Sequence, residues 1–101
     1  MSESKFIEPN KIGYTVYTKS NCTYCTNVKT LLSNVSDLSL IDCDAYLLDQ
    51  RDAFLEWIKT LVGKEYKTFP IVFYNGLFIG GFTETKEYYD SINSFEYLEN
   101  F

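Results

Sequence analysis

Cys22 and Cys25 are the residues of this sequence best suited to chemistry, because two residues between them let their thiols close a disulfide across one helical turn. They stand where a predicted strand gives way to a predicted helix. The N-terminus of a helix carries partial positive charge and unpaired amides, which favour a thiolate. We therefore expect Cys22 to be the attacking thiolate, with a pKa lowered from ~8.5 to roughly 3.5–7.5, and Cys25 to be the resolving thiol.

Two other interpretations of this pair need weighing. A structural zinc site takes four ligands, and beyond the pair the chain offers only Cys43 and carboxylates, since it contains no histidine. A pair of inert core cysteines fits poorly with the polar segment at residues 19–21, which indicates exposure. We expect Cys43 itself to be a small buried hydrophobe, with a regulatory thiol as the alternative.

A second motif is Thr68-Phe69-Pro70, which immediately precedes a predicted strand at residues 71–74. Proline is tolerated at the start of a strand, so a purely structural role is possible. Together with a Cys-x-x-Cys pair, however, we expect a cis-proline loop that faces the thiols. The backbone of Phe69 would then pair with an extended, peptide-like ligand.

A third motif is Gly80-Gly81-Phe82-Thr83. It is either a simple turn or the start of a binding helix. Glycines let a ligand approach the backbone closely, and the amides at a helix N-terminus can hold a carboxylate. We expect Thr83 to cap this helix and to face the ligand.

Hydrophobic periodicity predicts the elements that must position these motifs. Asn75-Gly76 between two apolar runs is a strong hairpin signal. We expect Asp49 to cap the second helix and Gly63 to end it. Strands are expected at residues 12–18, 38–42, 71–74 and 77–80, and helices at 22–34, 49–62 and 83–93. This order predicts an α/β fold with a mixed sheet flanked by helices.

Length and composition restrict the remaining possibilities. The 101 residues suit a single domain, with an N-terminal arm or short helix at 1–11 and an aromatic tail or short helix at 94–101. A net charge of −5 without basic clusters disfavours nucleic acid and anionic membranes as partners. No stretch is apolar and long enough to cross a membrane, and the N-terminus does not resemble a signal peptide, so we expect a cytoplasmic monomer.

The three motifs, in this order and at these intervals, resemble the glutaredoxin family of the thioredoxin fold over about residues 12–92. The resemblance implies a thioredoxin-like fold with a four-stranded sheet. It also implies that glutathione is the reductant, bound in a groove. Cys22 matches the nucleophile and Cys25 the resolving cysteine. The residues that match glutathione-binding positions are Lys19, Tyr24, Lys67, Thr68, Phe69, Pro70, Gly81, Phe82 and Thr83.

The sequence departs from the family pattern in places. Thr23 stands where many members have proline, and Thr83 followed by Glu84 replaces the usual acidic residue. The segment at 63–70 is longer than usual. Arg51 is the candidate for the family's contact from the second helix.

Three functions follow from these observations. The first is glutathione-dependent reduction of protein disulfides and glutathione mixed disulfides. The second, which Thr23 supports, is a dimer that shares a [2Fe-2S] cluster through Cys22 of each chain and glutathione. The third is a thioredoxin-like reductase that does not use glutathione, against which Lys19, Tyr24 and Gly80-Gly81 argue.

Overall fold

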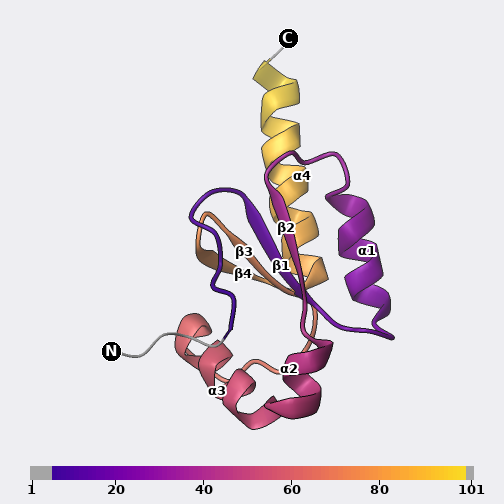
Figure 1. Ribbon diagram of the computed structural model, residues 1–101. Coiled ribbons are helices and arrows are strands. Elements are labelled where there is room, and N and C mark those ends of the chain that lie inside the picture. The colour runs from indigo at the N-terminus through magenta and orange to yellow at the C-terminus, as the bar shows by residue number, and fades with distance from the viewer. Residues whose placement is uncertain (1–5, 100–101) are drawn as a thin grey trace.

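A computed structural model describes residues 6–99, and for residues 93–99 it describes the backbone only (Figure 1). Four strands and four helices follow one another within this range. They are β1 (Tyr14–Thr18), α1 (Thr23–Leu31), β2 (Leu38–Asp42), α2 (Asp44–Asp49), α3 (Arg51–Val62), β3 (Ile71–Tyr74), β4 (Leu77–Gly80) and α4 (Phe82–Glu99).

The strands form one sheet in the order β2-β1-β3-β4. β1 and β2 run parallel, whereas β1 pairs antiparallel with β3 and β3 pairs antiparallel with β4. The prediction of an α/β fold with a four-stranded mixed sheet is therefore confirmed. Its parallel pair is connected by α1, as a parallel crossover requires.

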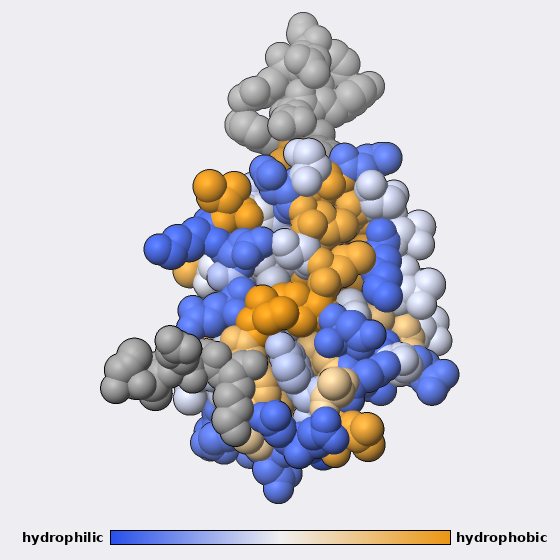
Figure 2. All heavy atoms as spheres, viewed as in Figure 1, coloured by the Kyte–Doolittle hydropathy of each residue, from blue (hydrophilic) through white to orange (hydrophobic). Residues whose placement is uncertain are grey.

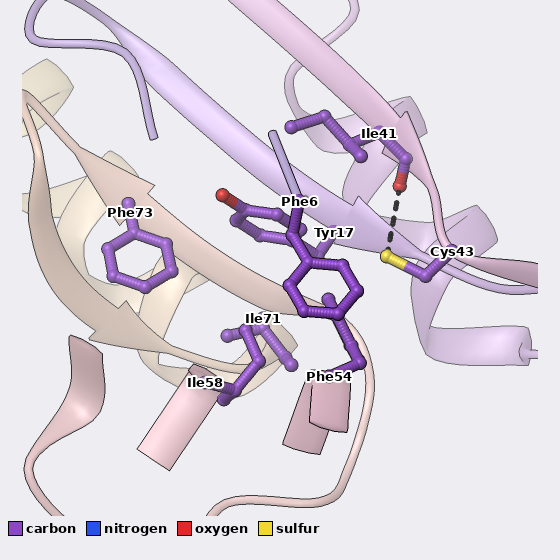
Figure 3. Packing of buried hydrophobic residues seen from close by; sticks show 8 residues of the cluster. All are labelled: Phe6, Tyr17, Ile41, Cys43, Phe54, Ile58, Ile71 and Phe73. Atoms are coloured by element: carbon purple, nitrogen blue, oxygen red, sulfur yellow. Dashed lines mark hydrogen bonds between the residues drawn. The ribbon is translucent and has the colours of Figure 1, made fainter. Parts of the chain in front are cut away.

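Helices cover both faces of the sheet, because neighbouring side chains of a strand point to opposite faces. On one face Val16 and Val72 pack with Val28 of α1 and with Leu32 at its C-cap, and α4 adds Phe82 and Tyr89. On the other face lies a second cluster, which Figure 3 shows. Its buried members are Phe6, Tyr17, Ile41, Cys43, Phe54, Ile58, Ile71 and Phe73. The central strand β1 is accordingly buried along its whole length.

Asn75 and Gly76 make the predicted hairpin between β3 and β4. Both have positive φ, 52° and 83°, as the tight hairpin turn requires. The start of β1 differs from the prediction because Gly13, with φ 84°, bends the chain before Tyr14. A Cβ at Gly13 would lie only 2.3 Å from the Asp37 carbonyl oxygen, so this position needs glycine.

The region before α3 contains a helix that the sequence analysis missed. Asp49 ends α2 instead of capping α3, so its predicted N-cap role is wrong, and Gln50 occupies that position without a side-chain cap bond. The six-residue α2 is too short for its own periodicity to be read. Tyr46 anchors it through ring contacts to Phe6 and Phe54, at 4.9 and 5.2 Å between centroids.

The last helix begins one residue earlier than predicted and runs further. α4 starts at Phe82, so Thr83 lies inside the helix and its predicted cap role is wrong. The helix continues to Glu99, so residues 94–99 belong to α4 and not to a separate element. Residues 100–101 lie outside the described residues.

The described part of the N-terminal arm packs against the core. Phe6 is 7% exposed and lies among the rings of Tyr46, Phe54 and Trp57. The hydroxyl of Tyr17 donates a hydrogen bond of 2.6 Å to the carbonyl of Ile7. Residues 6–10 therefore form neither a free arm nor a helix, whereas residues 1–5 lie outside the described residues.

Polar side chains cover most of the face shown in Figure 2, and apolar groups gather over the edge strand β2, where Leu40 is 48% exposed. Among the helices within residues 6–99, none has both the length and the apolarity to cross a bilayer.

Candidate active site

Cys22 occupies the N-cap of α1, where the chain leaves β1 and enters the helix. Asn21, with φ 55°, turns the backbone at this junction. The amide N–H of Cys25 donates a hydrogen bond of 3.1 Å to the Cys22 sulfur. The predicted location of the pair at a helix N-terminus is confirmed, and the hydrogen bond stabilises negative charge on Cys22.

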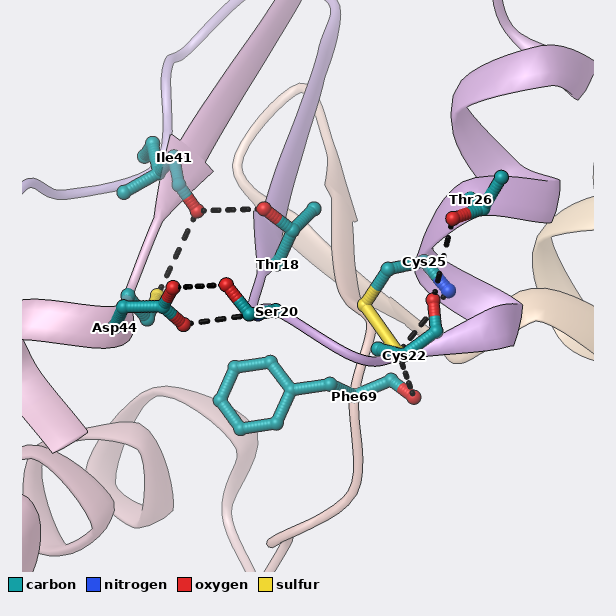
Figure 4. The surroundings of a disulfide bond; sticks show 9 residues. Thr18, Ser20, Cys22, Cys25, Thr26, Ile41, Asp44 and Phe69 are labelled. Atoms are coloured by element: carbon teal, nitrogen blue, oxygen red, sulfur yellow. Dashed lines mark hydrogen bonds between the residues drawn. A yellow bond between two sulfur atoms is a disulfide. The ribbon is translucent and has the colours of Figure 1, made fainter.

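The two cysteines are joined as a disulfide, with their Cα atoms 5.2 Å apart (Figure 4). Cys25 is 1% exposed, whereas Cys22 is partly exposed. Only Cys22 is open to an incoming sulfur. This difference supports Cys22 as the attacking residue and Cys25 as the resolving one.

The loop of Thr68, Phe69 and Pro70 faces the disulfide, as predicted. The Phe69–Pro70 peptide bond is cis. The carbonyl oxygen of Phe69 lies 3.6 Å from the Cys22 sulfur, so a reduced Cys22 thiol can donate to it. The Phe69 ring stacks on Phe54 at 6.4 Å, which ties this loop to the core beneath it.

A groove of about 700 Å³ opens beside Cys22 and contains nearly all of the predicted glutathione-binding residues. Tyr24 belongs to the Cys-x-x-Cys motif and Lys19 lies shortly before it, and the segments around Phe69 and Phe82 form the remaining walls. Pro70 is buried and does not line the groove. Arg51 is also absent from the lining. The full lining is Lys19, Asn21, Cys22, Thr23, Tyr24, Tyr66, Lys67, Thr68, Phe69, Gly81, Phe82, Thr83 and Glu84.

Tyr66 lines this groove although the sequence analysis did not identify it. Its ring packs edge-on against Phe78 at 4.9 Å, and a Cβ at Gly81 would lie 3.2 Å from its hydroxyl oxygen. Burial and then the nearby Glu84 raise the pKa of Tyr66, while a hydrogen bond with Thr68 opposes them. No local pattern could have placed Tyr66 here, because it lies within the irregular segment between α3 and β3.

Glu84 replaces Thr83 as the capping side chain of α4. Its Oε1 accepts a hydrogen bond of 2.9 Å from the amide of Gly81, which directly precedes the helix. This is half of a capping box, in which an acidic side chain satisfies an amide one turn earlier. The sequence contained a signal for this contact, because Glu84 stands three residues after Gly81, which directly precedes the helix.

The loop that carries Cys22 is held from the other side by Asp44, the first residue of α2. Ser20 donates both its amide, at 2.9 Å, and its hydroxyl to the Asp44 carboxylate (Figure 4). These bonds to Ser20, and then the charges of Lys19 and Lys29, lower the pKa of Asp44. The sequence did not reveal this contact, which joins residues 24 positions apart.

Lys19 and Lys67 supply the positive charge in the groove lining. Lys67 also lies 3.7 Å from Glu65 in an exposed pair, which contributes little in water. Among the described residues no group of three or more His, Cys, Asp or Glu side chains is arranged to hold a metal ion.

Comparisons with known proteins agree with this site and fold. The family model described as Glutaredoxin matches residues 14–79. Human "Glutaredoxin-2, mitochondrial" is 32% identical over 71 residues, which are 69% of this chain and 41% of the human protein. The chain therefore matches less than half the length of this curated relative.

Solved structures give the same result. Glutaredoxin 1 from Francisella tularensis superposes with a TM-score of 0.68 at 29% identity, over 81% of this chain and 96% of that one. A buckwheat glutaredoxin–glutathione complex superposes with a TM-score of 0.61 at 29% identity, over 81% of this chain and 72% of that one.

The fold and the site define a dithiol protein of the thioredoxin-like class, with a Cys-x-x-Cys pair at a helix N-terminus facing a cis-proline loop. Within that class, the chain belongs to the glutaredoxin family.

Proposed function

We propose that the protein is a thiol–disulfide oxidoreductase that uses glutathione to reduce protein disulfides and glutathione mixed disulfides. The observation that carries this proposal is the partly exposed Cys22 sulfur, which accepts the Cys25 amide at a helix N-terminus and borders a 700 Å³ groove. A thiolate at this position is both stabilised and accessible.

With a glutathione mixed disulfide, the Cys22 thiolate attacks the glutathione sulfur. A Cys22–glutathione disulfide forms, and the substrate leaves as its thiolate. A second glutathione thiolate then attacks the bound glutathionyl sulfur, which releases oxidised glutathione and restores the Cys22 thiolate. This route uses one cysteine of the protein and needs no other oxidant or reductant.

With a protein disulfide, Cys22 first forms a mixed disulfide with one substrate cysteine and releases the other as a thiolate. Cys25 then attacks the Cys22 sulfur and frees the substrate. The Cys22–Cys25 disulfide of the structure is the product of this step. Two glutathione molecules return it to the dithiol and become oxidised glutathione.

We place glutathione along the groove in an extended form. Lys19 and Lys67 are the cations available for its glycine carboxylate, and the backbone of Thr68 and Phe69 pairs with its cysteine. Gly81, Phe82 and Thr83 lie at the start of α4, whose amides suit the γ-glutamyl carboxylate. The buckwheat glutaredoxin was solved as a complex with glutathione, which supports glutathione as the ligand of this groove.

A coupled assay tests the activity directly. Reduced glutathione, glutathione reductase and NADPH are supplied with bis(2-hydroxyethyl) disulfide, and consumption of NADPH is followed. We expect turnover that depends on both glutathione and the protein. A protein that reduces the disulfide only with a dithiol reductant would contradict glutathione dependence.

Two substitutions test the orientation of glutathione. Thr83→Glu places like charge against the γ-glutamyl carboxylate, so we expect the KM for glutathione to rise several-fold. Lys67→Ala removes an exposed ion pair with the glycine carboxylate of glutathione. Such a pair is worth about 0–1 kcal/mol, so we expect only a modest rise in KM. An unchanged KM in Thr83→Glu would mean that glutathione does not lie in this direction.

A [2Fe-2S] cluster shared by two chains is the second candidate. Cys22 is the accessible cysteine, so each chain would offer one sulfur, and glutathione would supply the other ligands. Thr23 in place of proline favours this alternative. Anaerobic purification that yields a brown dimer would support it, whereas a colourless monomer would favour the oxidoreductase alone.

A cytoplasmic location stays a prediction, and the human relative is named as mitochondrial.

A further inference from the structure

Tyr66 places a phenol hydroxyl at the end of the groove where α4 begins. The residue lines the groove, and its ring packs edge-on against Phe78 of β4 with the centroids 4.9 Å apart. A Cβ at Gly81, the residue before α4, would lie 3.2 Å from the hydroxyl oxygen of Tyr66. The hydroxyl therefore lies in contact with the turn that leads into α4.

The surroundings of Tyr66 hold this hydroxyl in place. Phe78 packs edge-on against the buried Phe73 at 5.6 Å, which ties the Tyr66 ring to the core beneath the groove. A phenol hydroxyl offers one donor and two acceptor positions, so its hydrogen bond with Thr68 leaves it able to bind a ligand. Burial, and with it the charge of Glu84, raises the pKa of Tyr66, so the hydroxyl keeps its proton at neutral pH.

The start of α4 has one amide that is already occupied. The first amides of a helix have no partner within it, and Phe82 and Thr83 carry such amides. The amide of Gly81 differs, because Glu84 Oε1 accepts its hydrogen at 2.9 Å. A carboxylate that arrives at this helix start therefore finds one donor taken by an acid of the protein. The Tyr66 hydroxyl supplies a neutral donor at the same place.

The γ-glutamyl unit of glutathione matches this arrangement, because it carries a carboxylate and an ammonium on one carbon. The carboxylate suits the unpaired amides of α4 and the Tyr66 hydroxyl. The ammonium suits the carboxylate of Glu84, which also lines the groove. Tyr66 belongs to the segment at 63–70, which is longer than the family pattern, so its hydroxyl is an addition of this chain.

We propose that Tyr66 is a further ligand-binding residue, whose hydroxyl donates a hydrogen bond to the γ-glutamyl carboxylate of glutathione. This inference rests on the proposed function, since it assigns a residue to the same groove. Tyr66 makes and breaks no covalent bond, so the thiol exchange described above is unchanged. Its role is to distinguish glutathione from ligands that share the cysteinylglycine end but lack the γ-glutamyl unit.

Two mixed disulfides of one peptide provide the test. One carries glutathione on the peptide cysteine. The other carries N-acetylcysteinylglycine, which keeps the amide but lacks the γ-glutamyl carboxylate and ammonium. Reduced protein is mixed with each at a concentration below saturation, and release of the peptide thiol is followed by mass spectrometry. We expect the wild type to react at least about tenfold faster with the glutathionylated peptide, because hydrogen bonds to charged groups are lost with the other.

Tyr66→Phe removes only the hydroxyl, since a phenylalanine ring can keep the packing on Phe78. We expect the ratio of the two rates to fall roughly fivefold, as for the loss of one hydrogen bond to a charged group in an open groove. The rate with the truncated ligand and the pH dependence of Cys22 alkylation should both equal those of the wild type.

Tyr88→Phe is the matched control, because Tyr88 is an exposed tyrosine of α4 outside the groove lining. Its rate ratio should equal that of the wild type. Tyr66→Leu also lacks the hydroxyl, and it replaces Tyr66→Phe if that variant does not fold.

Three outcomes would overturn the role of Tyr66. A wild-type preference that survives unchanged in Tyr66→Phe would reject the hydrogen bond and leave the proposed function standing. An equal fall of both rates in Tyr66→Phe would show a general disturbance of the groove instead of a contact with the γ-glutamyl unit. Equal rates with both ligands in the wild type would reject the orientation of glutathione itself, and the contact with Tyr66 with it.

Discussion

Cys22 and Cys43 occupy equivalent positions in two neighbouring parts of the molecule. Cys22 comes after β1 and Cys43 after β2, which are parallel partners in the sheet. Each is the N-cap residue of the helix that follows. By location alone, both would be expected to carry an activated thiol.

Their surroundings are opposite. The Cys22 sulfur is partly exposed and accepts the amide of Cys25, whereas the Cys43 sulfur is completely buried and donates toward the Ile41 carbonyl at 3.6 Å. Burial, with a further contribution from the charge of Asp42, raises the pKa of Cys43 to about 12. Both cysteines therefore stand at a helix N-terminus, but only the Cys22 sulfur accepts an amide and remains accessible, as an activated thiolate requires.

Removing the sulfurs one at a time should give the largest difference. We expect Cys22→Ser to lose activity toward glutathione mixed disulfides entirely, because no other accessible thiolate remains. Cys25→Ser should keep much of this activity, since the one-cysteine route needs only Cys22. The coupled assay measures both, with Cys43→Ala as a control that retains full activity. Equal loss in Cys22→Ser and Cys25→Ser would show that the dithiol route is obligatory.

Alkylation of the reduced protein compares the two thiols directly. At pH 7 a thiol with a pKa of about 12 is ionised in roughly one molecule in 10⁵, and Cys43 is also shielded from reagent. Iodoacetamide should therefore modify Cys22 at least about a thousandfold faster than Cys43. Peptide mapping by mass spectrometry gives both rates. As the pH is raised, the alkylation rate of Cys22 should reach its plateau before pH 8. A titration midpoint near pH 8.5 would contradict an activated thiolate.

Alkaline pH should destabilise the folded protein, because buried thiol and phenol groups must ionise. The pKa of Cys43 is raised to about 12 and that of Tyr14 also to about 12, in both cases chiefly by burial. The folded state thus holds protons that the unfolded chain releases from about pH 9 upward. Its stability is complete below that pH and falls as the pH rises toward 12. Thermal unfolding monitored by circular dichroism should show this decline, and Cys43→Ala should make it less steep between pH 9 and 11.

Asp44 couples the two regions, because it follows Cys43 and binds Ser20 in the loop that leads to Cys22. We expect Asp44→Ala to slow the exchange reaction a few-fold by loosening this loop. Asp44→Asn can still pair with the Ser20 amide and hydroxyl, so it should stay within about twofold of the wild type. If the exchange rate falls equally in both variants, the charge of Asp44 matters and not its positioning of the loop. In that case the pH dependence of Cys22 alkylation should shift in both variants as well.

Local sequence patterns predicted the strands, the hairpin and the helices α1, α3 and α4, because each depends on neighbours along the chain. Asn75-Gly76 is one example, since its turn needs only residues that tolerate positive φ. The capping of α4 by Glu84 was also a local signal, although the sequence analysis assigned it to Thr83. The missed helix α2, in contrast, depends on distant contacts. Tyr46 stabilises α2 through Phe6, 40 positions away, and no pattern within six residues of helix reveals that.

Three motifs could be read from the sequence: a Cys-x-x-Cys pair at a strand-to-helix junction, a proline loop before a strand and a glycine pair before a helix. Tertiary structure alone decided the surroundings of each group. It buried Cys43 while leaving Cys22 open, brought Tyr66 into the groove, stacked Tyr24 on Phe82 and tied Ser20 to Asp44. The physical reason is that spacing along the chain sets which side chains share a turn or a strand face. Exposure, and the partners found across the fold, depend on how those elements pack.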